Sequence, residues 1–219
     1  MSAALWRYEP LGAGQFPLGE GPFRARGLAY VSALKFTDTR LRGGRAAFLE
    51  ALGPGDPFAS YYDQIFLVTG DYDVSPLMRL YNVVAAMQGV AVGRFIEERS
   101  RWSAESTSKG LWRPILKASS PEAMAESTAQ AFNRFFQPCK AEKISARPGH
   151  FEGELSKLPA CMSGLYTSST IGFFAEAVEI AGGRGCQVEM GKPVSDGELE
   201  GVSLQRVRFV ASWRSAQSG

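Results

Sequence analysis

Histidine, cysteine and long apolar runs are all scarce in this chain of 219 residues. It has one histidine, His150, and three widely spaced cysteines, Cys139, Cys161 and Cys186. Three scattered cysteines without a C-x-x-C pair form neither a disulfide framework nor a zinc site, so we expect reduced thiols. No apolar run approaches the length of a membrane span. The sequence thus excludes the disulfide-rich and membrane-spanning classes.

Neither sign of charge is in excess, because 24 basic and 22 acidic side chains leave a net charge of +2. That balance gives no strong field for nucleic acid or for an anionic membrane. Residues 1–10 lack the basic, apolar and small-residue order of a signal peptide, so we expect a cytoplasmic protein. A hydrophobic content of 45% suits one well-buried domain, placed at residues 23–215 after an irregular Gly- and Pro-rich arm at 1–22.

The first part of the chain predicts mainly helices. Ser75-Pro76 and Ser120-Pro121 each place a serine at the N-cap and a proline at the first helical position. Residues 26–36 alternate loosely and fit either an extended segment or a helix. Glycine and proline bound the other elements. We expect helices at 45–52, 56–67, 76–89, 90–104 and 121–137, a turn at 70–73 and a short element at 112–116.

After Pro138 the apolar period changes to two. Residues 140–147 and 150–155 alternate around Pro148-Gly149 and predict a hairpin. Residues 165–183 predict a long helix, with the hydroxyl cluster at 167–170 as its cap and Gly182-Gly183 as its end. Strands at 184–190 and 204–213 follow, joined by a connection at 191–201. The order predicts an α+β fold: an N-terminal helical layer packed on a small antiparallel sheet, with a strand–strand–helix–strand–strand C-terminal half.

This order resembles the haem-nitric-oxide/oxygen-binding (H-NOX) superfamily from about Arg26 to Trp213. The segments that resemble it are residues 89–97 (GVAVGRFIE), residues 166–170 (YTSST) and the following helix to Gly183. Its relatives include the four-vinyl-reductase-type small-molecule-binding domains and dimeric subunits of the TRAPP vesicle-tethering complex. The chain also resembles a large paralogous family of similar length from gliding soil bacteria.

The resemblance to H-NOX implies haem held by an axial histidine on a helix and by a Tyr-x-Ser-x-Arg segment. Tyr166 and Ser168 match that segment, but Thr170 replaces the arginine, and threonine cannot make a bidentate contact with a carboxylate. His150 lies in the predicted hairpin and not on a helix. We therefore expect a haem-less relative without a cofactor. Cys186 stands alone where vinyl-reductase-type domains carry several cysteines.

Aromatic and polar side chains of the predicted helices are candidates for lining an apolar pocket between the helices and the sheet, where the relatives bind ligands. The alternative is plain core packing, because aromatic stripes at helical spacing usually fill a core. The candidates are Tyr61, Tyr62, Tyr81, Met87, Phe132, Phe135, Phe136, Tyr166 and Ser168.

No arrangement of nucleophile, base and carboxylate surrounds His150, so we expect no catalytic residues and no metal ligands. The leading hypothesis is a non-enzymatic regulatory or scaffolding domain that binds a protein partner or a small apolar ligand. The TRAPP-like resemblance implies a homodimer. An enzyme or enzyme subunit acting on a hydrophobic small molecule and a haem gas sensor are the alternatives. A ligand-sized pocket would favour a ligand or a substrate, whereas a filled interior would favour protein–protein interaction.

Overall fold

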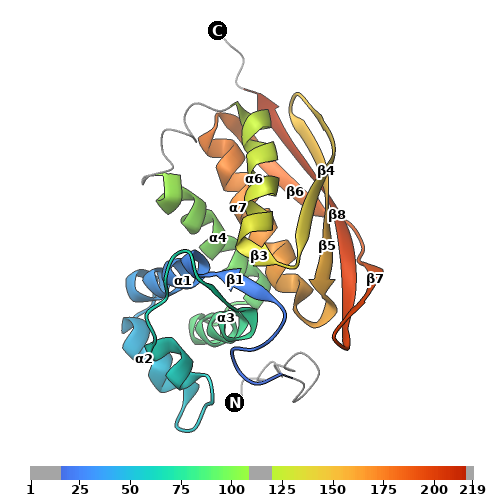
Figure 1. The fold of residues 1–219 in the computed structure, drawn as a ribbon. Helices are drawn as coiled ribbons and strands as arrows, with labels where there is room; N and C mark the ends of the chain where they lie inside the picture. The colour runs from blue at the N-terminus through green and yellow to red at the C-terminus, as the bar shows by residue number, and fades with distance from the viewer. Residues whose placement is uncertain (1–15, 109–119, 216–219) are drawn as a thin grey trace.

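The computed structural model describes residues 16–108 and 120–215, which form a layer of helices and two antiparallel sheets (Figure 1). This confirms the predicted α+β class. The helices are α1 (Gly27–Arg40), α2 (Gly44–Leu52), α3 (Val74–Gln88), α4 (Val92–Ser108), α6 (Pro121–Phe135) and α7 (Ser163–Ile180), with 3-10 turns η1 (Ala59–Asp63) and η2 (Ala160–Met162). The strands are β1 (Arg24–Arg26), β2 (Asp71–Asp73), β3 (Phe136–Gln137), β4 (Lys140–Arg147), β5 (His150–Pro159), β6 (Gly183–Met190), β7 (Val194–Leu199) and β8 (Val202–Ser215).

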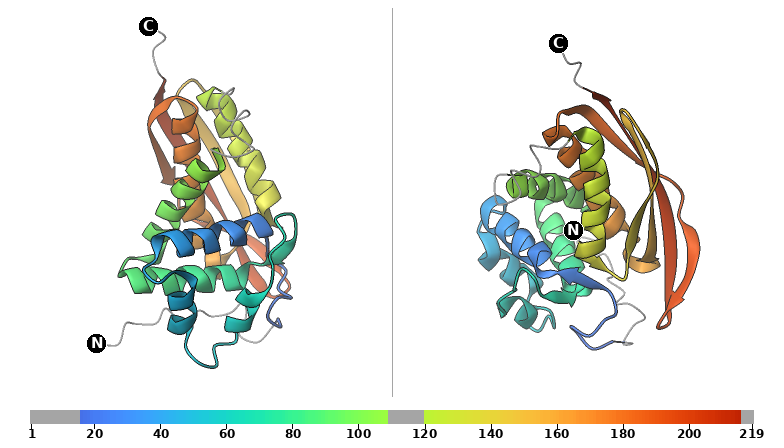
Figure 2. Two further views of the ribbon diagram at one scale, coloured as in Figure 1. Left: turned by 90° about the vertical axis from the view of Figure 1, so that its left-hand side faces the viewer. Right: turned by 45° about the horizontal axis from the view of Figure 1, so that its top comes forward.

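The larger sheet has the order β4-β5-β8-β6, and β7 also pairs with β8. Helices α6 and α7 lie on one face of this sheet, as the two views in Figures 1 and 2 agree. Alternate residues of β8 turn to that face and are buried, as the period of a strand requires. Among them Phe209 packs against Phe151 of β5 and Phe174 of α7, with ring centroids 5.9 and 5.6 Å away. These rings fill the core between the sheet and α7.

The smaller sheet has the order β2-β1-β3 and joins the start of the helical layer to the end of α6. Its buried residue Asp73 accepts hydrogen bonds from the backbone N–H groups of Ser75 at 2.9 Å, Gly19 at 3.1 Å and Gly21 at 3.3 Å. The Tyr30 hydroxyl donates to the Asp73 carbonyl. One carboxylate thus fixes the N-terminal segment against the first turn of α3.

Helices α4 and α7 run parallel and in register. Residues four apart on α4 meet residues four apart on α7, because a Cβ at Gly93 would lie 3.3 Å from the Ser168 hydroxyl and Arg101 pairs with Glu176 at 3.8 Å. Midway, a Cβ at Gly172 would lie only 2.1 Å from the carbonyl oxygen of Glu97. The two backbones are therefore in direct contact at Gly172.

Several local predictions are confirmed. Ser120 caps α6 by accepting from the Ala123 N–H at 3.2 Å, and Pro121 is the first residue of that helix. The hairpin around Gly149 forms from β4 and β5. Residues 26–36, which fitted two alternatives, lie mostly in helix α1.

Other local predictions are wrong. Residues 56–67 form only η1, because Asp56 accepts from the Phe58 N–H at 2.8 Å and the Tyr62 hydroxyl donates to the Pro76 carbonyl at 2.6 Å, which fixes a tighter path. The turn expected at 70–73 contains β2, and the connection at 191–201 contains β7. The N-cap of α3 is Asp73 rather than Ser75.

The hydroxyl cluster at 167–170 does not cap a helix, because α7 already begins at Ser163. Inside the helix, the Thr167 hydroxyl donates to the Ser163 carbonyl at 3.1 Å, one turn back. The short element expected at 112–116 lies outside the described residues, as does the first part of the arm at 1–22. Among the described helices, none combines the length and apolar character needed to cross a bilayer.

The close contact at Gly172 predicts that adding one methyl group there lowers the free energy of unfolding. Gly172→Ala gains roughly 1 kcal/mol of helix propensity but forces two backbones apart, at a steric cost of roughly 3 kcal/mol. We expect a net loss of about 2 kcal/mol in the free energy of unfolding, measured by urea denaturation. Gly164→Ala in the same helix is the matched control, because a Cβ there meets nothing within 4 Å. Equal stability of the two variants would contradict the close contact.

Candidate functional site

The predicted pocket residues lie in several separate places rather than around one cavity. Tyr61 and Tyr62 belong to η1, Tyr81 and Met87 to α3, and Ser168 to the contact between α4 and α7. Met87 is exposed, and Phe135 is only partly buried. The remaining three candidates, Phe132, Phe136 and Tyr166, do meet in one cluster.

The three aromatic rings of that cluster pack directly against one another. Tyr166 packs against Phe136 and Phe132 at centroid distances of 5.1 and 6.3 Å, and those two rings are 5.2 Å apart. Among the described residues, the buried Tyr166 hydroxyl has no partner with good hydrogen-bond geometry, and its polar neighbour is the weakly bonding Cys139 thiol. The Cys139 thiol lies beside it but donates to the Lys157 carbonyl at 3.4 Å. Burial, together with this thiol, raises the pKa of the Tyr166 hydroxyl, so the phenol stays neutral.

Tyr81 lies against a buried arginine. The guanidinium carbon of Arg99 on α4 is 5.3 Å from the centre of the Tyr81 ring, and its Nη2 donates to the Ala29 carbonyl at 3.4 Å. Among the described residues, a ring face and a carbonyl, rather than a carboxylate, stabilise this cation. The contact joins α4 to α3 and α1, and it fixes packing rather than exposing a reactive group.

Tyr61 and Tyr62 form part of an aromatic cluster that includes residues of α1 and α2. Tyr30 stacks on Phe66 at a centroid distance of 4.4 Å, and Tyr61 lies 6.0 Å from both rings. Tyr62 packs against Phe48 of α2 at 5.0 Å. On the outer side of this cluster lies an open groove of about 500 Å³, bounded by α1 and the segment that follows η1.

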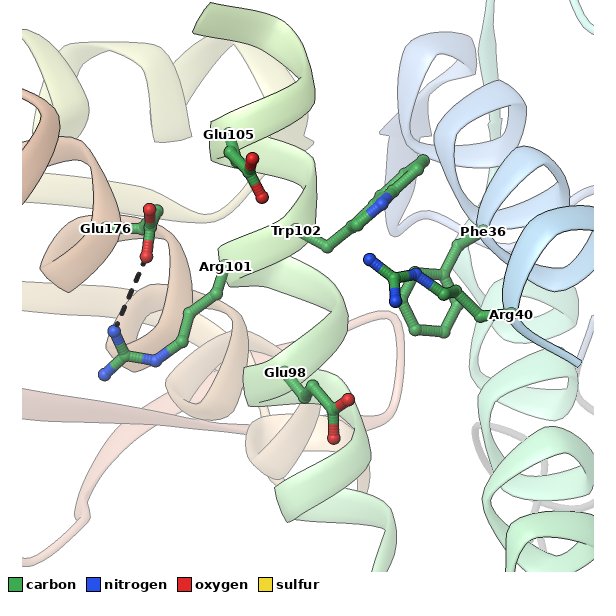
Figure 3. Close-up of a pocket in the computed structure, with 7 residues that line it drawn as sticks. All are labelled: Phe36, Arg40, Glu98, Arg101, Trp102, Glu105 and Glu176. Carbon is green, nitrogen blue, oxygen red and sulfur yellow. Dashed lines mark ion pairs between the residues drawn. The ribbon is translucent and has the colours of Figure 1, made fainter.

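A second, smaller pocket of about 140 Å³ lies among α1, α4 and α7 (Figure 3). Figure 3 shows Trp102 and Arg40 on the α1 side and the Arg101–Glu176 ion pair on the α7 side. Burial and the nearby Glu179 raise the pKa of Glu176. The lining is Phe36, Arg40, Glu98, Arg101, Trp102, Glu105 and Glu176. Such a charged lining does not suit an apolar ligand.

Sequence reasoning missed both hollows. The groove has a signal in the sequence, because four consecutive apolar residues, 65–68, follow a turn without a helical or strand period. The small pocket has no such signal, since its residues come from three helices. His150 lies at the start of β5, outside both linings. No group of three or more His, Cys, Asp or Glu side chains within the described ranges could hold a metal ion.

No protein-family model matches the chain, and no curated protein sequence is similar to it. Solved structures do match it. The Fe(II) unliganded H-NOX protein from K. algicida superposes with a TM-score of 0.62 at 10% identity, over 89% of this chain and 99% of that one. The chain has an H-NOX-like fold.

Two further H-NOX structures agree. A mutant of Cs H-NOX gives a TM-score of 0.61 at 16% identity, over 88% of this chain and 98% of that one. A mutant of T. tengcongensis H-NOX gives 0.57 at 16% identity, over 86% and 97%. At such identities the likeness establishes the fold, and the ligand has to be argued from the residues of this chain.

The pattern Tyr166-x-Ser168-x-Thr170 lies entirely inside α7, so Tyr166 and Thr170, four residues apart, share a face and Ser168 lies on another. Tyr166 points to Phe136 on the side of α6, and Ser168 points to Gly93 of α4. The Thr170 hydroxyl is buried without a hydrogen-bond partner among the described residues. Tyr166 and Ser168 therefore do not converge on one ligand.

Removing the hydroxyl group from two tyrosines of the predicted pocket should have different effects on the free energy of unfolding. Tyr166→Phe removes a buried hydroxyl that has only the weak Cys139 thiol beside it in the described residues, so we expect unchanged or increased stability, by up to about 1 kcal/mol. Tyr62→Phe removes the hydrogen bond to the Pro76 carbonyl and should lose roughly 1–2 kcal/mol. Urea denaturation measures both. A greater loss for Tyr166→Phe would reveal a partner, such as a ligand, at that hydroxyl.

The cysteines predict a selective thiol reaction. Burial raises the pKa of Cys139 to about 12, and burial with Glu179 nearby raises that of Cys186 to about 12, whereas Cys161 is exposed. A higher pKa means less of the reactive thiolate, by about a thousandfold at pH 8 relative to an ordinary thiol. We expect one fast-reacting thiol in the native protein with a thiol-specific chromogenic reagent, and three in denaturant. Cys161→Ser should abolish the fast reaction; its persistence would contradict the assignment.

Proposed function

We propose that this chain is a haem-free, non-enzymatic regulatory or scaffolding domain that binds a protein partner and acts as a homodimer. One observation supports the proposal: side chains that were candidates for lining a ligand pocket pack on one another instead. Phe132, Phe136 and Tyr166 pack on one another, and α4 and α7 touch along their backbones.

The residues present do not fit haem. His150, the single histidine of the chain, lies on β5 instead of a helix. Thr170 replaces the arginine of the H-NOX pattern, so no guanidinium stands there to pair with a carboxylate. The contacts of Gly93 with Ser168 and of Gly172 with Glu97 leave no layer between α4 and α7 for a planar macrocycle.

A protein partner is favoured over a small apolar ligand by the two hollows. The pocket beside Trp102 is small and carries five charged side chains, Arg40, Glu98, Arg101, Glu105 and Glu176. The groove beside α1 is larger but open along one side, so it would leave a small molecule largely in water, whereas a protein surface could cover it. The enzyme hypothesis is weaker, because Tyr166 and Ser168 point to different faces of α7.

Mass measurement on one sample tests this proposal. We expect freshly purified protein to show the mass of two bare chains under native conditions and of one chain when denatured. It should show no Soret band as purified, and added hemin should keep the spectrum that it has in buffer alone. An H-NOX protein prepared in parallel is the positive control. Mass lost on denaturation would indicate a retained ligand and overturn the ligand-free interior. A Soret band would favour the gas-sensor alternative.

A further inference from the structure

Three large aliphatic side chains project into solvent from one short segment. Ile65 is 86% exposed, Leu67 is 63% exposed and Val68 is 50% exposed, while Phe66 between them is buried in the aromatic cluster. The buried ring holds the segment in place, so its neighbours are displayed on the surface. A contiguous exposed apolar segment of this kind marks an interaction surface.

The same segment forms one wall of the groove described above. The other wall is the face of α1 that carries Val31, Leu34, Lys35 and Asp38, at the spacing of one helix face. The floor is apolar, because Leu34 and Tyr62 are buried there. In Figure 1, α1 and α2 lie on the side of the molecule away from the large sheet. Each chain therefore presents a projecting apolar side chain, Ile65, directly beside an open groove of about 500 Å³.

The charges at this groove are balanced. Asp38 pairs with Arg45 at 3.1 Å within the chain. Lys35 and Asp63, both exposed, make no ion pair among the described residues, and each lies at the groove. A strongly acidic or basic partner would call for a rim of one sign. One unpaired cation and one unpaired anion instead make the surface complementary to itself.

We propose that this groove is the surface through which two copies of the chain associate, a refinement that rests on the homodimer of the proposed function. Ile65 of each copy enters the groove of the other, and Lys35 of each copy faces Asp63 of the other. Such an arrangement is isologous, because every contact occurs twice about a two-fold axis. A two-fold axis requires each chain to carry both members of every contact. Here each chain carries both the projecting Ile65 and the groove, and both Lys35 and Asp63.

Sedimentation equilibrium tests the apolar contact. Ile65→Asp changes a side chain with almost no contacts inside its own chain, so the fold should survive. We expect its dimer dissociation constant to rise by at least about tenfold, since a carboxylate would have to enter an apolar groove. Ile144→Asp on β4, where the isoleucine is 46% exposed, is the matched control and should leave the constant unchanged. Equal constants for wild type and Ile65→Asp would overturn the proposed surface while leaving the homodimer intact.

Charge reversal tests the symmetry. Lys35→Glu and Asp63→Lys should each weaken the homodimer, because each places two like-charged pairs across the interface. An equal mixture of the two variants should form a heterodimer of wild-type strength, in which both pairs are again of opposite sign. Failure of the mixture to recover would overturn the facing of Lys35 and Asp63. A wild-type chain that stays monomeric would overturn both the homodimer and this surface.

Discussion

The contact between the backbones of α4 and α7 at Gly172 determines how the two halves of this protein are joined. Helix α7 covers the large sheet, and α4 belongs to the N-terminal helical layer. Because no side chain intervenes between Gly172 and Glu97, the helices approach more closely than ordinary packing allows. The Arg101–Glu176 ion pair and the Gly93–Ser168 contact continue the same register in both directions.

This closeness leaves no room for a ligand between α4 and α7 at Gly172. The aromatic side chains of α6 and β3 pack ring against ring with Tyr166 of α7. Polar groups left inside, such as the Tyr166 and Thr170 hydroxyls, have no partners with good hydrogen-bond geometry in the described residues. Of the two hollows described above, the groove along α1 is the larger.

The sequence predicted the class of the fold and those elements that local chemistry decides. Ser120 and Pro121 start α6 because a cap needs only its own neighbours. The hydroxyl cluster at 167–170 gave a wrong prediction of the helix start. Hydroxyl groups that can cap a helix can also donate to a backbone carbonyl one turn earlier inside a helix, as Thr167 does. Aromatic residues alone could not show whether they line a pocket or fill it, since that depends on how the elements that carry them pack together. Nor could they show that Tyr62 would bond to Pro76 and shorten the helix expected at 56–67.

The hydrogen bonds of Asp73 affect local unfolding of the N-terminal segment. Its carboxylate accepts hydrogen bonds from three backbone N–H groups, two in the N-terminal segment and one at the start of α3. Its backbone carbonyl accepts a hydrogen bond from the Tyr30 hydroxyl of α1. Detachment of residues 19–21 would leave a buried negative charge with a single donor, which is costly. We therefore expect one cooperative unit that unfolds together in hydrogen exchange and proteolysis. It consists of the N-terminal segment, the first turn of α3 and the start of α1. A protease that attacks the N-terminal segment would have to overcome the same bonds that hold the helix bordering the groove.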